Sequence, residues 1–171
     1  EHSKIEEFID NVVLELEGLD ILINNAGINI DNLSLKMKDE EWKKVIDVNL
    51  TSTFLLCKYA IKKMLKNKYG RIVNITSIVG HTGNVGQANY AAAKMGVVGL
   101  SKSMALDMQR FGVTSNCIAP GAATRVTDSV PEDRRRSGSA NSETIAEDDH
   151  PRSPANVAKP IVYMASEDSD W

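Results

Sequence analysis

Residues 71–94 read RIVNITSIVGHTGNVGQANYAAAK, and the interpretation of the whole chain starts from this stretch. Its first six residues form an apolar, β-branched run, which is typical of a buried strand in a parallel sheet. A loop with three glycines follows, and the alanines within residues 90–94 then favour a helix. The stretch therefore predicts a strand, a loop that begins at its carboxyl end, and a helix.

Three side chains of this stretch can converge on one site. Ser77 comes directly after the strand, and the four-residue step from Tyr90 to Lys94 puts phenol and ammonium on one helix face. An ammonium close to a phenol favours the phenolate and lowers the pKa of the phenol towards working pH. These residues are therefore candidates for acid–base chemistry, although a Tyr-x-x-x-Lys pair alone also arises by chance on many helices.

The rest of the chain alternates between helix and strand patterns. Apolar spacing and short apolar runs predict helices over 5–16, 40–66, 87–110 and 155–165, and strands over 19–23, 71–76 and 113–119. Such alternation is typical of an α/β protein in which helices cover both faces of a parallel sheet. We therefore expect one domain over residues 1–171, with a doubly wound, Rossmann-like fold of three layers.

One edge of this predicted sheet collects further candidate residues. The sequence Asn24-Asn25-Ala26-Gly27 follows the first strand, Ser77 follows the second, and Pro120-Gly121 follows the third. Ligands of doubly wound sheets lie beyond the carboxyl ends of the strands. Asn49 lies within an apolar helical stripe, where a buried amide must be hydrogen-bonded. Its amide is either a structural group that binds backbone or part of the site, and both can hold at once.

These motifs, in this order, resemble the short-chain dehydrogenase/reductase family. The resemblance runs from about residue 19 to residue 121, and it includes Ser77 placed thirteen positions before Tyr90. Within the family, the amino-acid sequence is most similar to the bacterial 3-oxoacyl-[acyl-carrier-protein] reductase type of fatty acid biosynthesis. This similarity is carried by residues 37–52, 70–80 and 82–94. The family's first strand, its glycine-rich turn, two further β-α units and its last strand have no counterpart here, so the expected fold is incomplete at both ends.

The resemblance implies hydride transfer between a nicotinamide cofactor and a carbonyl or secondary alcohol. Tyr90 would donate the proton, Ser77 would bind the carbonyl oxygen, Lys94 would lower the pKa of the phenol and bind the cofactor ribose, and Asn49 would anchor a water. The substrate would be a 3-oxoacyl thioester, free or on an acyl carrier protein, with a hydroxyacyl-CoA, a steroid or a small ketone as alternatives. A non-catalytic binding or dimerising module is the competing hypothesis.

The resemblance also implies which residues contact the cofactor. NADP is expected, and NAD stays open because the residues that read the ribose have no counterpart in this sequence. The expected contacts are Asn25, Ala26, Gly27, Tyr90, Lys94, Pro120, Gly121 and Ala123. Residues 124–150 are mostly polar and are expected to form a mobile substrate lid. The family's usual threonine there is replaced by Arg125.

Composition excludes several other classes of function. A net charge of −3 and a pI near 5.6 argue against general attraction to nucleic acid or anionic lipid. No apolar run approaches the roughly 20 residues that cross a bilayer, so a cytoplasmic protein without a membrane partner is expected.

Cys57 and Cys117 are expected to be buried free thiols. Helices 40–66 and 87–110 are apolar on more than one face, which predicts a homodimer or homotetramer.

Overall fold

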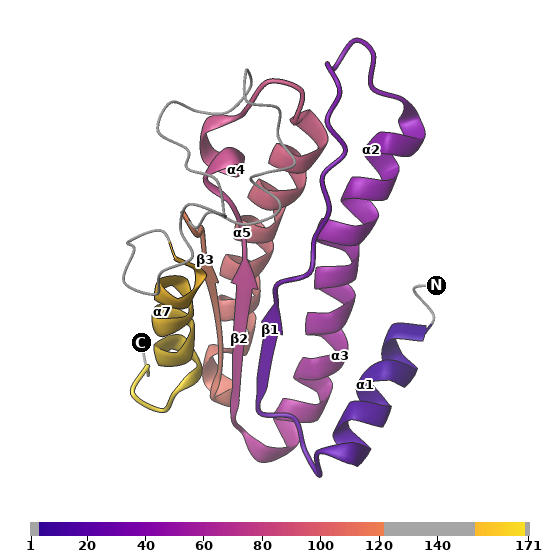
Figure 1. The fold of residues 1–171 in the computed structure, drawn as a ribbon. Coiled ribbons are helices and arrows are strands. Elements are labelled where there is room, and N and C mark those ends of the chain that lie inside the picture. Colours follow the sequence, from indigo (N-terminus) through magenta and orange to yellow (C-terminus); the bar gives the residue numbers. More distant parts are fainter. Residues whose placement is uncertain (1–3, 122–152, 170–171) are drawn as a thin grey trace.

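A parallel three-stranded sheet forms the centre of the computed structural model, which describes residues 4–121 and 153–169. The strands are β1 (Ile21–Asn24), β2 (Gly70–Ile75) and β3 (Val113–Ile118), in the order β1-β2-β3 (Figure 1). Asn24 of β1 lies opposite Asn74 of β2, which lies opposite Cys117 of β3. Every residue of β2 is buried, as expected for the central strand.

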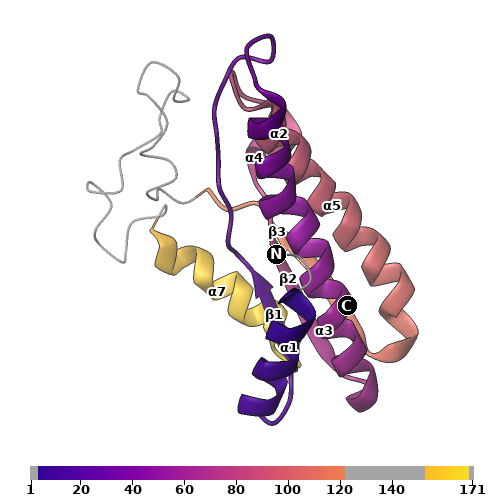
Figure 2. The same cartoon turned by 90° about the vertical axis from the view of Figure 1, so that its right-hand side faces the viewer.

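Helices cover both faces of this sheet, so the predicted three-layer α/β fold is confirmed. One face carries α3 (Ser52–Asn67) and α5 (Ala88–Met108), and α1 (Lys4–Glu15) packs against α3. The other face carries α7 (Pro154–Ala165), which contacts β2 (Figure 2). The helices predicted over 5–16, 87–110 and 155–165 therefore lie close to their expected bounds, as do the three strands.

The helix predicted over 40–66 is one continuous helical segment with a change of winding inside it. It begins as α2 (Asp39–Ile46), widens into the π-helical turn η1 (Asp47–Thr51) and continues as α3. At its start, the Glu41 carboxylate accepts a hydrogen bond of 2.9 Å from the backbone N–H of Lys38. A π-turn inside an α-helix often marks a functional site, and this one contains Asn49.

The loop expected after β2 is in part helical. Residues 78–82 form the short helix α4 (Ile78–Thr82), which the sequence did not predict. The Ser77 hydroxyl caps it by accepting a hydrogen bond of 3.2 Å from the N–H of Val79. This serine cap satisfies a backbone donor that would otherwise be unpaired, which favours a helical turn despite the glycines that follow.

The hydrophobic core lies between the sheet and the helices α1, α3 and α5. Its buried members are Ile9, Leu19, Cys57, Ala60, Met64, Ile72, Met104 and Val113. Cys57 is buried and free, as predicted, whereas the free thiol of Cys117 is only partly buried. The Asn24 amide donates to the Asn74 carbonyl oxygen at 2.8 Å and to the Cys57 sulfur at 3.2 Å, so polar groups also link the strands inside the core.

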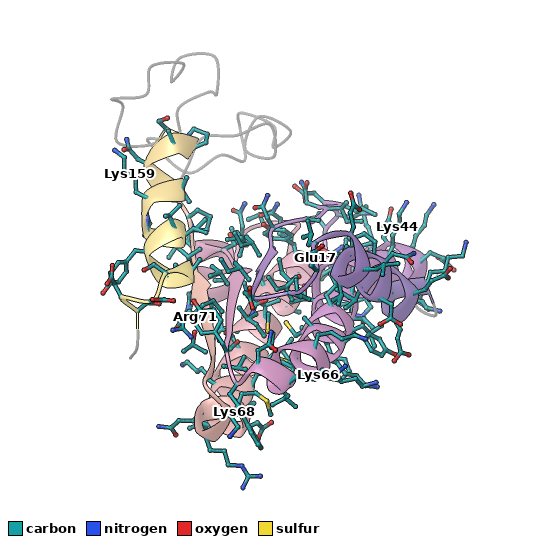
Figure 3. The ribbon with its side chains drawn as sticks, turned by 90° about the horizontal axis from the view of Figure 1, so that it is seen from below. Glu17, Lys44, Lys66, Lys68, Arg71 and Lys159 are labelled. Carbon is teal, nitrogen blue, oxygen red and sulfur yellow. The ribbon has the colours of Figure 1, made fainter. Side chains whose placement is uncertain are left out.

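A buried arginine connects α7 to the sheet. Arg71 of β2 donates from Nε to the carbonyl oxygen of Ser166 at 3.2 Å and from Nη1 to that of Gly70 at 3.2 Å. Figure 3 shows this side chain on the side of the sheet next to α7. Pro160 lies inside α7, past its first turn, where it cannot donate a backbone hydrogen bond.

Two expectations fall outside the part of the chain that the structure describes. The proposed lid over residues 124–150 and the cofactor contact at Ala123 both lie between residues 122 and 152. Within residues 4–121 and 153–169, none of the helices combines the length and the apolar character needed to cross a bilayer.

Candidate active site

Ser77 lies where the sequence placed it, at the carboxyl end of β2. Its extended backbone leads from the strand into α4, and its hydroxyl also forms a hydrogen bond with the phenol of Tyr90. Tyr90 is the third residue of α5, whose amino end packs beside α4. A strand end and a helix start that are thirteen residues apart in sequence therefore bring the two hydroxyl groups together.

Lys94 lies one helical turn after Tyr90 and is held firmly. The ammonium nitrogen lies 5.7 Å from the centre of the Tyr90 ring and donates a hydrogen bond of 2.8 Å to the carbonyl oxygen of Ile75. The Thr76 hydroxyl binds the backbone carbonyl of Lys94 at 2.6 Å. The lysine is 5% exposed, so it is a buried cation fixed against the end of β2. The prediction that it shares a helix face with Tyr90 is confirmed.

Asn49 reaches the same region from the π-turn. Its side chain is 1% exposed, and it accepts a hydrogen bond from the N–H of Ile28 at 2.8 Å and donates to the carbonyl of Ile28 at 2.7 Å. A Cβ placed on Gly27 would lie 2.8 Å from Asn49 Oδ1 and 3.5 Å from Lys94 Nζ. Asn49 and Lys94 therefore meet at Gly27. The hydrogen bonds to the backbone show the structural role of the Asn49 amide. Its expected role in anchoring a water remains a prediction.

Among the described residues, small side chains lie at the edge of the sheet beside these residues. Asn25, Ala26 and Gly27 are exposed after β1, and Gly121 is exposed and Pro120 partly buried after β3. Both segments flank Ser77, which follows the central strand. Small residues let a ligand approach the backbone closely. An ammonium and two hydroxyl groups lie beside these small residues.

Comparison with known proteins identifies the family. A model of the short chain dehydrogenase family matches residues 1–136. The chain belongs to the short-chain dehydrogenase family. It is therefore an oxidoreductase domain of the nicotinamide-dependent kind, as the sequence predicted, and Ser77, Tyr90 and Lys94 lie within the matched part.

Several curated relatives of this chain have the same name, 3-oxoacyl-[acyl-carrier-protein] reductase FabG. The chain is 42% identical over 166 residues to a 3-oxoacyl-[acyl-carrier-protein] reductase, FabG, of Rickettsia bellii, covering 96% of this chain and 67% of the relative. It is 41% identical over 170 residues to the FabG of Haemophilus influenzae, covering 99% and 69%. For the FabG of Salmonella typhimurium, identity is 47% over 134 residues, covering 78% and 55%. The chain thus spans roughly half to two thirds of these dehydrogenases.

Burial shifts the pKa values of Lys94 and Tyr90 in opposite directions. It lowers the pKa of the Lys94 ammonium to about 8, because the charged form loses its hydration. Burial also raises the pKa of the Tyr90 phenol; the hydrogen bond from Ser77 opposes this, and the charge of Asp31 adds to it. The lowered phenol pKa that the sequence predicted is not found in this structure. Lys94 directs its hydrogen bond to Ile75 rather than to the phenol.

Three polar residues near Tyr90 were missed by the sequence interpretation. Asp31 binds the side chain of Gln87, and Asn89 donates a hydrogen bond of 2.9 Å to the carbonyl of Ile30. Gln87 and Asn89 are almost fully buried at the start of α5. The sequence contains one indication of Gln87, its position. Gln87 lies three residues before Tyr90, so the two side chains lie on neighbouring parts of the same helix face. The partners of Gln87 and Asn89 lie more than fifty residues away and could not be read from spacing.

Proposed function

We propose that this chain carries the catalytic residues of an NADPH-dependent 3-oxoacyl thioester reductase. One observation carries the proposal: the phenol of Tyr90, the hydroxyl of Ser77 and the buried ammonium of Lys94 lie together at the carboxyl end of β2. The names of the relatives, all 3-oxoacyl-[acyl-carrier-protein] reductases, support the choice of substrate.

The arrangement suits transfer of a proton to a carbonyl oxygen. A tyrosine phenol is protonated at neutral pH, and burial raises the pKa of Tyr90 further, so the phenol can act as the proton donor. The Ser77 hydroxyl, which lies close enough to the phenol to lower its pKa, would bind the same carbonyl oxygen and share its developing charge. A bound nicotinamide dinucleotide would supply the hydride.

Lys94 would serve the site in two ways. Its ammonium would bind the ribose of the cofactor, a role supported by its position close to Gly27. Because its pKa is near 8, it can also take up and release a proton close to neutral pH. Asn49 would hold the Ile28 backbone in place and anchor the water through which Lys94 is resupplied with protons.

The remaining cofactor contacts are proposed from the open edge of the sheet. Asn25, Ala26 and Gly27 on one side and Pro120 and Gly121 on the other would line the dinucleotide, together with Tyr90 and Lys94. NADPH is proposed because the most similar reductase type generally uses it, and NADH is the alternative. A cytoplasmic location and a carbonyl substrate, free or bound to an acyl carrier protein, belong to the same proposal.

A substrate panel tests this function most directly. The protein would be assayed with acetoacetyl-CoA, acetoacetyl-acyl carrier protein and a simple ketone, each with NADPH and with NADH. We expect thioester-dependent oxidation of NADPH that exceeds the rate with the simple ketone. Preference for the ketone would reassign the substrate, and no oxidation with any pair would refute the reductase function in favour of a binding module.

Self-association is proposed on separate grounds. Trp42 and Phe54 are exposed on the α2–α3 segment, and Met95 and Leu106 are exposed on α5. These two helices were the ones predicted to be apolar on more than one face. Exposed aromatic and aliphatic residues on adjacent helices favour association through that surface. We propose a homodimer or homotetramer that buries these side chains.

A further inference from the structure

Thr76 lies between the last residue of β2 and Ser77, and its backbone is fixed by the neighbouring strand. The residue is 4% exposed, and its N–H donates a hydrogen bond of 2.8 Å to the carbonyl oxygen of Ile118 in β3. Its hydroxyl donates a hydrogen bond of 2.6 Å to the backbone carbonyl oxygen of Lys94 in α5. Thr76 therefore connects three elements, β2, β3 and α5, one residue before Ser77.

Lys94 is joined to the end of β2 both by its backbone and by the tip of its side chain. Its carbonyl oxygen accepts the bond from Thr76, and its Nζ donates a hydrogen bond of 2.8 Å to the carbonyl oxygen of Ile75. A lysine side chain has many rotamers when only its backbone is fixed. Because both ends are held and the residue is 5% exposed, the position of the ammonium depends on the position of this turn of α5.

The Thr76 bond is additional to the hydrogen bonds of the helix itself. In an α-helix the carbonyl oxygen of Lys94 accepts the N–H of residue 98, so this turn is already bonded without Thr76. The additional bond therefore sets how far α5 lies from the end of β2. α4 packs closely on the same turn, because a Cβ placed on Gly80 would lie 2.9 Å from the backbone nitrogen of Met95 and 3.2 Å from the carbonyl carbon of Lys94.

Few groups in the described part of the chain could hold the ammonium in place of Ile75. Neither ion pair among the described residues involves Lys94. The centre of the Tyr90 ring lies 5.7 Å from Nζ, and Asn49 Oδ1 already accepts a hydrogen bond from the N–H of Ile28. Burial is the cause of the lowered pKa of Lys94. The carbonyl oxygen of Ile75 is therefore the group that stabilises the charged form here.

We propose that Thr76 is a positioning residue of the site: its hydroxyl holds the Lys94 turn of α5 against the end of β2 and thereby keeps the ammonium bonded to Ile75. The importance of this for turnover rests on the proposed function of Lys94, and the proposal adds a residue that acts through Lys94. Both hydrogen bonds of Thr76 go to backbone groups, so Thr76 acts on position and takes no part in proton transfer.

Substitution of Thr76 by Val tests the proposal, because valine has nearly the same shape but no hydroxyl. A methyl group needs about 3.3 Å from a carbonyl oxygen, whereas the Thr76 oxygen lies at 2.6 Å, so the Lys94 turn must move away by about 0.7 Å. The protein would be labelled with ¹³C at the lysine ε carbon, and the Lys94 signal would be assigned by its loss in Lys94→Met. We expect Lys94 of Thr76→Val to titrate at a pH about 0.5 lower than in the wild type, because the charged form loses its acceptor and stays buried. Thr76→Ser keeps the hydroxyl and should retain the wild-type titration.

Two further variants make the test specific. Ser101→Ala removes another buried hydroxyl of α5, which is 1% exposed and lies 3.0 Å from the hydroxyl of Ser115 in β3, so it should reduce stability and leave the Lys94 titration unchanged. Thr76→Ala removes the hydroxyl without added bulk and should shift the titration in the same direction as Thr76→Val, which covers a folding defect of the valine variant. An unchanged or higher Lys94 titration in a folded variant without the hydroxyl, or an equal shift in Ser101→Ala, would overturn the proposal.

Turnover gives a second readout. With the substrate and cofactor that the panel identifies, Thr76→Val should lower kcat about tenfold and Thr76→Ser should restore it. An unchanged kcat in Thr76→Val would count against the proposal. Since the Lys94 titration needs no turnover, it is independent of the substrate panel, whose failure would refute the reductase function instead.

Discussion

Replacement of Gly27 by Ala should disturb the site through one identifiable contact. The new Cβ would lie 2.8 Å from Asn49 Oδ1, which is closer than such atoms approach in proteins. The Asn49 side chain is buried, and both of its polar ends are bonded to Ile28, so it cannot swing away freely. The distance to Lys94 Nζ, 3.5 Å, is an ordinary contact. The cost should therefore come from Asn49 alone.

The size of the effect follows from the two ways in which the clash can be relieved. Overpacking a close contact costs about 1–3 kcal/mol, and loss of one hydrogen bond costs about 0.5–1.5 kcal/mol. We expect Gly27→Ala to lower the free energy of unfolding by about 2 kcal/mol, which for a domain of this size lowers Tm by about 4–8 °C. Turnover should also fall, because Asn49 is displaced at the point where it meets Lys94.

A double-mutant cycle in urea or by calorimetry would check this explanation. In an Asn49→Ala background the clashing oxygen is absent, so Gly27→Ala should cost less than about 0.5 kcal/mol there. Gly99→Ala is the matched control, since a Cβ at that position of α5 meets no atom within 4 Å and alanine favours a helix. Equal costs of Gly27→Ala with and without the Asn49 side chain would refute the reasoning.

Other consequences of the structure can be measured separately. Tyr90→Phe should abolish turnover and leave cofactor affinity nearly unchanged by fluorescence titration; retained activity would show that another group donates the proton. The pKa of Lys94 is lowered from its ordinary 10.5 to about 8, so above pH 8 the unfolded chain binds more protons at this group and stability should rise with pH until Cys57, whose ordinary pKa is 9.0, begins to oppose the slope; Lys94→Met should remove this rise. Burial raises the pKa of Cys57 to about 12, so the folded protein should protect this thiol from alkylating reagents at pH 8, and rapid modification of Cys57 would contradict its burial. Light scattering at micromolar concentration should give a dimer or tetramer, and Trp42→Glu with Phe54→Glu should dissociate it; a wild-type monomer would count against the proposed interface.

The order of elements and the shared face of Tyr90 and Lys94 could be predicted because both depend on local regularities. A strand has a period of two and a helix a period of 3.6, so apolar spacing reveals each element within its own sequence. A four-residue step puts two side chains on one face of any helix, whatever packs around it. Ser77 could be placed for a similar reason, since the carboxyl ends of parallel strands share one edge of the sheet.

The surroundings of these groups depended on the tertiary structure. Asn49 binds Ile28, twenty-one residues before it, and Asp31 meets Gln87, fifty-six residues away, so neither pairing leaves a local pattern. The π-turn around Asn49 likewise coincides with a contact across the fold, because the Asn49 amide binds the backbone of Ile28. The direction of each pKa shift follows from burial by distant elements. The sequence by itself predicted which groups come together at the carboxyl end of β2, whereas packing decided that Lys94 faces Ile75 and that burial raises the pKa of Tyr90.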